Sequence, residues 1–198
     1  MVFFMSRNGD CRKMSFLKPK LDYKMVEPTV YDEKIRSGRL KNTLELMGNY
    51  EVIEEPVLDV GEPNEFGCQL ANILRIDIYN TEGDLDSVDC FPVKINFKTI
   101  WIFEVIEHLK NPDLFLTELS SLCSKDTRIF LSYPYRPFVF LWNENHYHEI
   151  EPNRFRELIE SAGYEIIQCI RKWQTVKKKF IRVPYTHYYY ELRIKNGG

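Results

Sequence analysis

One stretch decides the fold of this chain: PVLDVGEPNEFG, residues 56–67. Val57, Leu58 and Val60 form the short apolar, β-branched run that is typical of a strand covered on both faces. Gly61 follows, where the backbone must turn sharply or approach a ligand closely, and a helical segment is expected over residues 68–74. A strand, a glycine turn and a helix N-terminus present backbone N–H groups and partial positive charge together. The stretch therefore predicts the outline of a nucleotide-type cofactor site.

A second stretch, TIWIFEVIEHLKNP at residues 99–112, is another apolar strand that ends in an acidic, histidine-bearing turn. Taken with residues 57–61, it resembles the class I S-adenosylmethionine-dependent methyltransferases, whose members often carry such a segment after the fourth strand. Residues 148–164 are similar to the last helix and following strand of that family. The resemblance covers roughly residues 57–170, most of the chain.

The resemblance implies a single α/β Rossmann-like domain, with a mostly parallel twisted sheet, helices on both faces and a late antiparallel strand. Alternating strands and helices favour the same architecture. We assign residues 28–198 to this domain and residues 1–27, which are basic, irregular and interrupted by Pro19, to a loosely attached N-terminal arm.

Composition supports a single soluble domain. The 198 residues are 44% hydrophobic and 28% charged, and the formal net charge of -2 argues against nucleic acid or an anionic membrane as partner. Five scattered cysteines indicate a reducing compartment. No apolar run reaches the roughly 18 to 20 residues of a membrane span. We expect a cytoplasmic protein.

The expected elements follow from apolar periodicity and turn residues. Helices are predicted at residues 32–47, at 68–74, from 112 onward and at 152–162. Strands are predicted at residues 75–79, 93–97, 97–103, 128–133, 164–171 and 185–194. Residues 173–184, which carry most of a basic cluster interleaved with aromatic rings, are interpreted as a solvated connection rather than a nucleic-acid surface.

Methyl transfer from a sulfonium depends mainly on positioning, so most site residues should be cofactor holders. The resemblance implies that Asp59 and Gly61 hold the amino-acid end of S-adenosylmethionine. An acid in or after the second strand should hold the ribose, and spacing leaves open which one. Asp84 and Leu85 are expected to flank the adenine. The full set of expected cofactor residues is Asp59, Val60, Gly61, Glu62, Gly67, Asp77, Asp84, Leu85 and Phe103.

The turn after residue 60 departs from the family pattern. Pro63 stands at the second glycine position, and the third is Glu65 or is displaced to Gly67. Because proline lacks an N–H and has a fixed φ, the ordinary turn cannot form. Either a modified loop holds the cofactor, or the fold serves as a non-catalytic binding or scaffold module.

Catalytic and acceptor residues are expected around the ends of the fourth and fifth strands. Glu104 and His108, one helical turn apart if that segment is helical, could supply a general base or could serve in capping and packing. The aromatic loop of residues 133–147 could cap the core or form the wall for a small-molecule or surface-presented methyl acceptor. Its candidate residues are Tyr135, Arg136, Trp142 and His146.

Metal binding was weighed for His146, His148 and Glu149, which are close in sequence. Three such residues without further converging ligands do not define a metal site. The sequence therefore predicts no metal.

Overall fold

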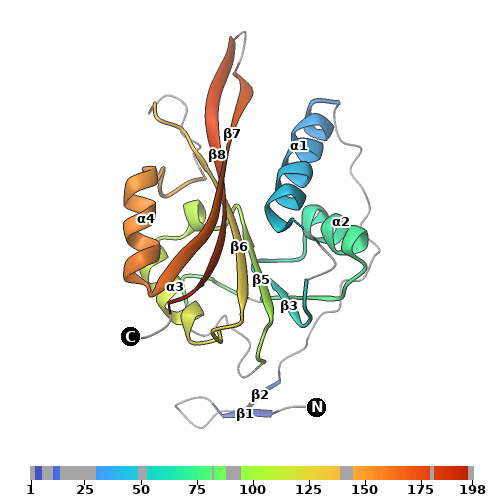
Figure 1. Cartoon of the computed structure of the whole chain (residues 1–198), viewed down its shortest axis with the longest axis vertical. Coiled ribbons are helices and arrows are strands. Elements are labelled where there is room, and N and C mark those ends of the chain that lie inside the picture. Colours follow the sequence, from blue (N-terminus) through green and yellow to red (C-terminus); the bar gives the residue numbers. More distant parts are fainter. Residues whose placement is uncertain are drawn as a thin grey trace.

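The computed structural model describes residues 3–5, 11–13, 30–48, 53–81, 83–87, 95–138, 145–178 and 181–195, with side chains from residue 38 onward except 176–182 (Figure 1). The helices are α1 (Val30–Met47), α2 (Glu65–Leu74), the short 3-10 helix η3 (Ile106–His108), α3 (Pro112–Ser120) and α4 (Pro152–Ser161). The strands are β1 (Phe3–Met5), β2 (Cys11–Lys13), β3 (Val57–Asp59), β4 (Ile78–Asn80), β5 (Thr99–Phe103), β6 (Arg128–Tyr135), β7 (Tyr164–Lys178) and β8 (Ile181–Ile194).

Six strands form one sheet in the order β4-β3-β5-β6-β8-β7. The pairs β4–β3, β3–β5 and β5–β6 are parallel, whereas β8 is antiparallel to both β6 and β7. Only β8 therefore runs against the other strands. The predicted fold class, a mostly parallel sheet with a late antiparallel strand, is confirmed.

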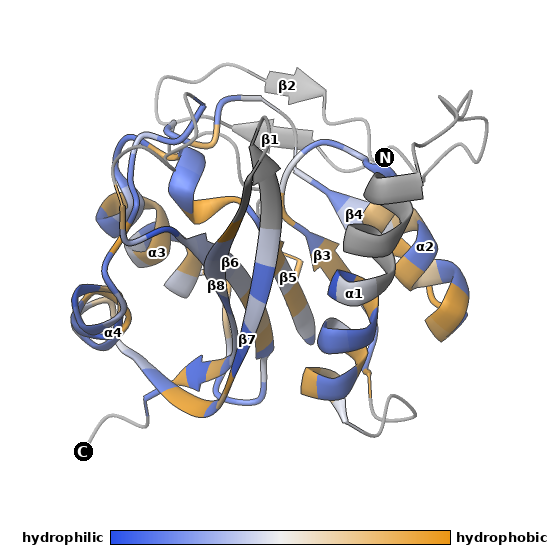
Figure 2. Ribbon diagram, turned by 90° about the horizontal axis from the view of Figure 1, so that it is seen from above, coloured by the Kyte–Doolittle hydropathy of each residue, from blue (hydrophilic) through white to orange (hydrophobic). Residues whose placement is uncertain are grey.

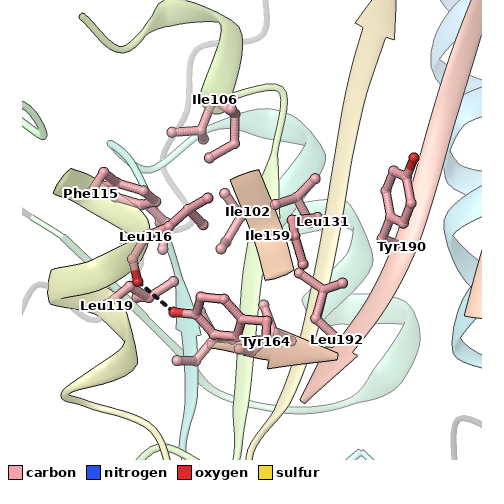
Figure 3. Packing of buried hydrophobic residues seen from close by; sticks show 14 of the residues in the cluster. Ile102, Ile106, Phe115, Leu116, Leu119, Leu131, Ile159, Tyr164, Tyr190 and Leu192 are labelled. Atoms are coloured by element: carbon pink, nitrogen blue, oxygen red, sulfur yellow. Dashed lines mark hydrogen bonds between the residues drawn. The ribbon is translucent and has the colours of Figure 1, made fainter. Parts of the chain in front are cut away.

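Helices cover both faces of the sheet, as Figure 2 shows from above. Leu58 and Ile100 point to one face, where they pack with α3 and α4, and Val57 and Trp101 point to the other, where they pack with α1 and α2. Figure 3 shows the first of these clusters, in which the buried Tyr164 hydroxyl donates to the Leu116 carbonyl at 2.7 Å. Burial on both sides explains why the parallel strands are continuously apolar.

Three expected strands differ from the structure near their ends. The strand predicted at 75–79 begins only at Ile78, because Arg75 caps α2 in the left-handed conformation (φ 57°) and its N–H bonds back to the last turn. Of the strand predicted at 93–97, residues 95–97 lie outside any strand and 93–94 are outside the described residues. The fourth predicted strand begins at Thr99.

The interpretation of residues 173–184 as a connection is wrong, because the described parts of this segment continue β7 and β8 as a long hairpin. Trp173 pairs with Thr186 and Gln174 with Tyr185. The hairpin extends beyond the rest of the sheet (Figure 1), and Trp173 is 66% exposed. Solvated side chains weaken the apolar alternation on which strand prediction depends.

Within the predicted N-terminal arm, Phe3–Met5 pairs antiparallel with Cys11–Lys13. The rest of residues 1–27 lies outside the described residues, so the arm stays a prediction. Among the described residues, no helix is long and apolar enough to cross a membrane.

Helix α2 begins three residues earlier than expected, because Asn64 caps it. The Asn64 side chain accepts a hydrogen bond from the Gly67 N–H at 3.0 Å. Gly67 also lies against the buried Asp59 carboxylate, where a methyl group built on Gly67 would overlap Asp59 Oδ2. The displaced glycine thus lets the end of β3 and the first turn of α2 pack directly together.

We expect Gly67→Ala to destabilise the fold by roughly 1 to 3 kcal/mol, because the added methyl must displace the Asp59 carboxylate or move α2. The free energy of unfolding from urea denaturation measures this. Gly38→Ala in α1 is the matched control, since a Cβ there meets no described atom within 4 Å. It should be neutral or stabilising by up to about 1 kcal/mol. Equal effects of the two substitutions would contradict the packing argument.

Candidate functional site

The parallel strands bring their carboxyl ends to one edge of the sheet. β3 ends at Asp59, β4 at Asn80, β5 at Phe103 and β6 at Tyr135. The chain runs from β3 to β4 on one side and then crosses to β5 on the other side of β3. Such a reversal of direction opens a crevice beyond the strand ends, which is where open α/β sheets bind ligands.

Asp59, Gly61 and Asn80 form a compact polar junction at the ends of β3 and β4. The Asn80 amide donates to the Asp59 carbonyl at 3.1 Å, to Asp59 Oδ2 at 3.3 Å and to the Gly61 carbonyl at 3.3 Å. The Gly61 N–H donates to the Thr81 hydroxyl at 2.8 Å. Gly61 has φ 113°, a conformation that side-chain-bearing residues rarely adopt. The junction fixes the turn in the absence of the usual glycine spacing.

Asp59 is 3% exposed, and burial raises the pKa of its carboxyl to about 7, against the opposing effect of the Asn80 hydrogen bond. Val60, equally buried, continues the ladder by donating its N–H to the Trp101 carbonyl at 2.9 Å. Two of the expected cofactor residues are therefore interior groups that shape the turn.

The other expected cofactor residues divide by position. Glu62 is exposed on the turn and Gly67 is buried in α2. Asp77 precedes β4 and lies exposed at the amino end, so the structure does not bring it to the carboxyl edge. Asp84 is exposed and Leu85 half-buried in the loop after β4, at the expected edge. Phe103 is half-buried and meets Phe66 of α2 edge to face, with ring centroids 5.5 Å apart.

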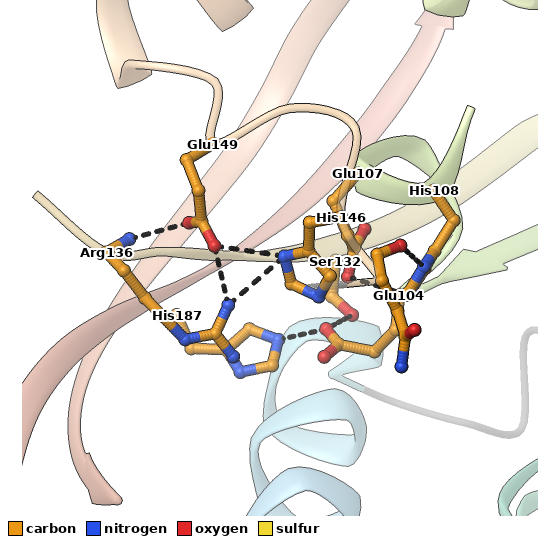
Figure 4. A network of polar contacts seen from close by, with 9 residues as sticks. Glu104, Glu107, His108, Ser132, Arg136, His146, Glu149 and His187 are labelled. Atoms are coloured by element: carbon orange, nitrogen blue, oxygen red, sulfur yellow. Dashed lines mark hydrogen bonds and ion pairs between the residues drawn. The ribbon is translucent and has the colours of Figure 1, made fainter. Parts of the chain in front are cut away.

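Glu104 follows β5 in the left-handed conformation (φ 58°), which turns its side chain toward β6 and β8 (Figure 4). Its Oε1 forms an ion pair with His187 Nε2 at 2.6 Å and accepts from the Ser132 hydroxyl at 3.3 Å. Burial would raise the pKa of Glu104, but His187, the nearby Arg39 and these hydrogen bonds hold it well below its usual range. A positive φ at a non-glycine residue is a form of strain that concentrates at functional sites.

Glu107 and His108 lie in η3, not in a continuous helix with Glu104. The left-handed residue 104 breaks the chain direction, so the expected helical spacing of Glu104 and His108 does not occur, although both belong to the polar cluster in Figure 4. Glu107 is 1% exposed, and neither carboxylate oxygen has a hydrogen-bond partner among the described residues. Burial and the Glu104 charge raise the pKa of Glu107 well above its usual value.

Arg136, His146 and Glu149 form the other half of the cluster. The Arg136 N–H and guanidinium donate to Glu149 at 3.0 and 2.9 Å, and His146 Nδ1 lies 3.0 Å from Glu149 Oε1. Burial opposes these contacts, but together they lower the pKa of Glu149. Tyr135, half-buried, ends β6 beside them. Trp142 lies outside the described residues.

Sequence reasoning missed three residues that the structure brings to this edge: Arg39, Asn80 and His187. Asn80 ends a strand whose boundaries were shifted, and a polar residue directly after an apolar run was the available signal. His187 reaches Glu104 only because β8 pairs with β6, where Pro134 lies opposite His187. Arg39 lies in α1, and the Cζ atom of its guanidinium stacks 4.8 Å from the centroid of the Phe66 ring. No local sequence pattern predicts the contact of His187 with Glu104 or that of Arg39 with Phe66.

No protein-family model matches the chain, and no curated protein matches it in sequence. Solved structures do match. A SAM-dependent methyltransferase from Archaeoglobus fulgidus aligns over 80% of this chain and 93% of its own, with a TM-score of 0.56 and 11% identity. The chain has a methyltransferase-like fold. The YcgJ protein from Bacillus subtilis aligns over 80% of this chain and 100% of its own, with a TM-score of 0.52 and 13% identity.

The methyltransferase fold also occurs in the [4+2]-cyclase SpnF, which aligns over 85% of this chain and 85% of its own, with a TM-score of 0.56 and 12% identity. The fold therefore does not by itself determine the reaction. The reaction of this chain must therefore be inferred from its own site residues.

We expect Asp59→Asn to flatten the pH dependence of stability. Because the folded pKa of Asp59 is raised from 3.8 to about 7, the folded chain binds a proton that the unfolded chain has lost between those values. The stability from this proton is present at low pH and disappears as the pH rises to about 7. Between about pH 5 and pH 8, wild type should lose about 3 kcal/mol of unfolding free energy relative to the variant.

Urea denaturation of both proteins at the two pH values measures this difference. Asp77→Asn, at an exposed aspartate, is the control and should shift the pH dependence by less than about 0.5 kcal/mol. A pH-independent difference between wild type and Asp59→Asn would show that the buried carboxyl keeps one protonation state across the range.

Proposed function

We propose that this protein is an S-adenosylmethionine-dependent methyltransferase whose acceptor is unidentified. The observation that carries the proposal is the junction of Asp59, Gly61 and Asn80, which lies at the strand ends beside the N-terminus of α2. Its position is the one where open α/β sheets bind ligands. The methyltransferase fold makes S-adenosylmethionine the cofactor to test first.

The residues of the turn fit such a cofactor. A Cβ built on Gly61 meets no described atom within 4 Å, so there is open space beside the backbone at this edge. Glu62 is exposed and does not occupy the interior of the turn. Pro63 removes one N–H, and the Asn64 cap fixes the first turn of α2 instead. The α2 N-terminus keeps a partial positive charge suited to the carboxylate end of the cofactor.

Bound S-adenosylmethionine would supply the methyl group and its own leaving group. We assign Asp84 to the ribose hydroxyls, Leu85 to the adenine and Phe103 to the methionine portion. Glu104 is charged and held by His187, and its lowered pKa makes it a weak general base. We therefore assign it to orienting the cofactor or acceptor through hydrogen bonds. Tyr135, Arg136 and His146 are assigned to acceptor binding, and for Trp142 this role rests on the sequence alone.

The alternative is a binding or scaffold module that has kept the fold without turnover. Pro63 in the glycine-rich turn favours this alternative. The two functions differ in cofactor affinity, which can be measured without knowing the acceptor.

Calorimetric titration with S-adenosylhomocysteine should show saturable binding at one site, and Gly61→Val should weaken that binding at least about tenfold, which is about 1.4 kcal/mol. A β-branched residue at φ 113° is strained by roughly 1 to 3 kcal/mol and fills the open space beside the turn. Gly38→Ala should bind like wild type. Absence of heat at about 1 mM ligand with folded protein would reject the methyltransferase and leave the binding module.

A further inference from the structure

Glu107, His108 and His146 converge at one point of the polar cluster (Figure 4). One potential ligand atom from each, a carboxylate oxygen or a ring nitrogen, lies within 4.8 Å of the others. The backbone brings them together: the Tyr147 and His148 N–H groups both donate to the Glu107 carbonyl, at 2.9 and 3.3 Å. These bonds hold the segment after residue 144 against η3.

The histidine rings are already oriented by hydrogen bonds. His108 Nδ1 lies 2.8 Å from the Asn145 carbonyl oxygen, and His146 Nδ1 lies 3.0 Å from the Glu149 carboxylate. Both partners are acceptors, so an N–H placed on each Nδ1 would leave the Nε2 lone pair of each ring available to an ion. Arg136 Nη1 lies within hydrogen-bond distance of His146 Nδ1, at 3.2 Å, and also donates to Glu149 at 2.9 Å.

A carboxylate or carbonyl behind the second ring nitrogen is the arrangement that fixes metal-binding histidines. The His146 side chain is 4% exposed and the two rings are nearly perpendicular, with centroids 4.7 Å apart. Two imidazoles therefore stand preoriented on one side of Glu107.

The environment of Glu107 is a second observation, independent of the orientation of the histidine rings. Glu107 is 1% exposed, and neither of its oxygens accepts a hydrogen bond from any described residue. Its acidic neighbours are matched, Glu104 by His187 and Glu149 by Arg136. Glu107 Oε1 lies 4.0 Å from His108 Nε2. Burial of a carboxyl group without hydrogen bonds is costly, and such groups are normally paired or coordinate a metal. The cluster thus combines one buried carboxyl group, which accepts no hydrogen bond from the described residues, with two imidazole rings.

We propose that Glu107, His108 and His146 bind a divalent first-row transition ion of the Zn²⁺ or Mn²⁺ class. Two imidazoles and one carboxylate suit these ions better than Mg²⁺ or Ca²⁺, which prefer oxygen ligands. Three protein ligands leave coordination positions open for an oxygen of a second molecule. The sequence analysis considers His146 together with His148 and Glu149 and predicts no metal, so this proposal differs from it. Glu149 is here a positioning residue that orients the His146 ring.

The ion would act as a Lewis acid toward an oxygen of the methyl acceptor, a role that rests on the proposed function. Binding of the ion does not depend on the proposed function. The two can therefore be tested separately.

Titration of EDTA-treated, dialysed protein with Zn²⁺ and with Mn²⁺, followed by calorimetry and thermal unfolding, should show one saturable site and a rise in unfolding temperature. Glu107→Gln and His146→Gln should each lower the affinity at least about tenfold. Glu149→Gln should lower it about 10- to 100-fold through loss of the ring orientation. His148→Gln is the control and should bind like wild type, because the His148 ring lies 3.2 Å from the Lys110 carbonyl and is not part of the proposed ligand set.

Absence of saturable binding at about 1 mM of either ion would overturn the proposal, as would equal losses in His146→Gln and His148→Gln. Thermal unfolding in EDTA shows whether each variant is folded, and Glu107→Gln keeps the shape of the parent side chain. S-adenosylhomocysteine affinity of Glu107→Gln should stay within about threefold of wild type. Lost cofactor binding with retained metal binding would reject the methyltransferase alone, and the converse would reject the metal site alone.

Discussion

Parallel pairing of β3, β4, β5 and β6 is the constraint on which the rest of the structure depends. The ladders fix four strands in one direction, so their carboxyl ends must open onto the same edge. Because helices bury both faces, polar groups that need solvent or a ligand concentrate where the strands end. Asp59, Asn80 and Glu104 each occupy such a position, although Asn80 lies 21 positions after Asp59 and Glu104 lies 24 positions after Asn80.

The antiparallel strand β8 completes this edge. Its pairing with β6 carries His187 to the last part of that strand, where it meets Glu104. The left-handed conformation of Glu104 turns the side chain toward this partner, and the ion pair and the Ser132 hydrogen bond compensate for part of the cost of burying a carboxylate. Glu107, three residues later, accepts no hydrogen bond from the described residues, and its Oε1 lies 4.0 Å from His108 Nε2. Two carboxylates in one short segment thus have opposite electrostatic environments.

The divergent turn after β3 shows how the same backbone problem can be solved with other residues. Instead of closely spaced glycines, the chain uses Asn64 to cap α2 and Gly67 to let Asp59 approach the helix. Asn80 then ties the two loops together through three acceptors. The turn is partly buried and is held by these hydrogen bonds, which take the place of the closely spaced glycines.

Local sequence pattern determined the elements and the fold class. Apolar runs such as residues 57–60 and 99–103, each followed by a turn, are enough to predict buried parallel strands, and Gly48 and Pro112 mark helix ends as expected. The pattern failed where the sheet does not bury both faces, in the exposed part of the β7–β8 hairpin. The resemblance to the methyltransferases, together with the positions of the strand ends, placed Asp59, Gly61, Glu104, His108, Arg136 and His146 near one edge.

Only the tertiary structure decided how those residues combine. The ion pair of Glu104 with His187 depends on strand order and on the β8 register. The burial of Glu107 beside His108 and His146 depends on hydrogen bonds across 37 to 41 positions. Asp77 was expected at this edge but does not reach it. Because Arg75 caps α2 and β4 begins only at Ile78, Asp77 lies at the amino end of β4, opposite the carboxyl edge. The alternation of side chains along a strand is a local property of the sequence, whereas the partner of a residue across the sheet depends on strand order and register in the whole fold.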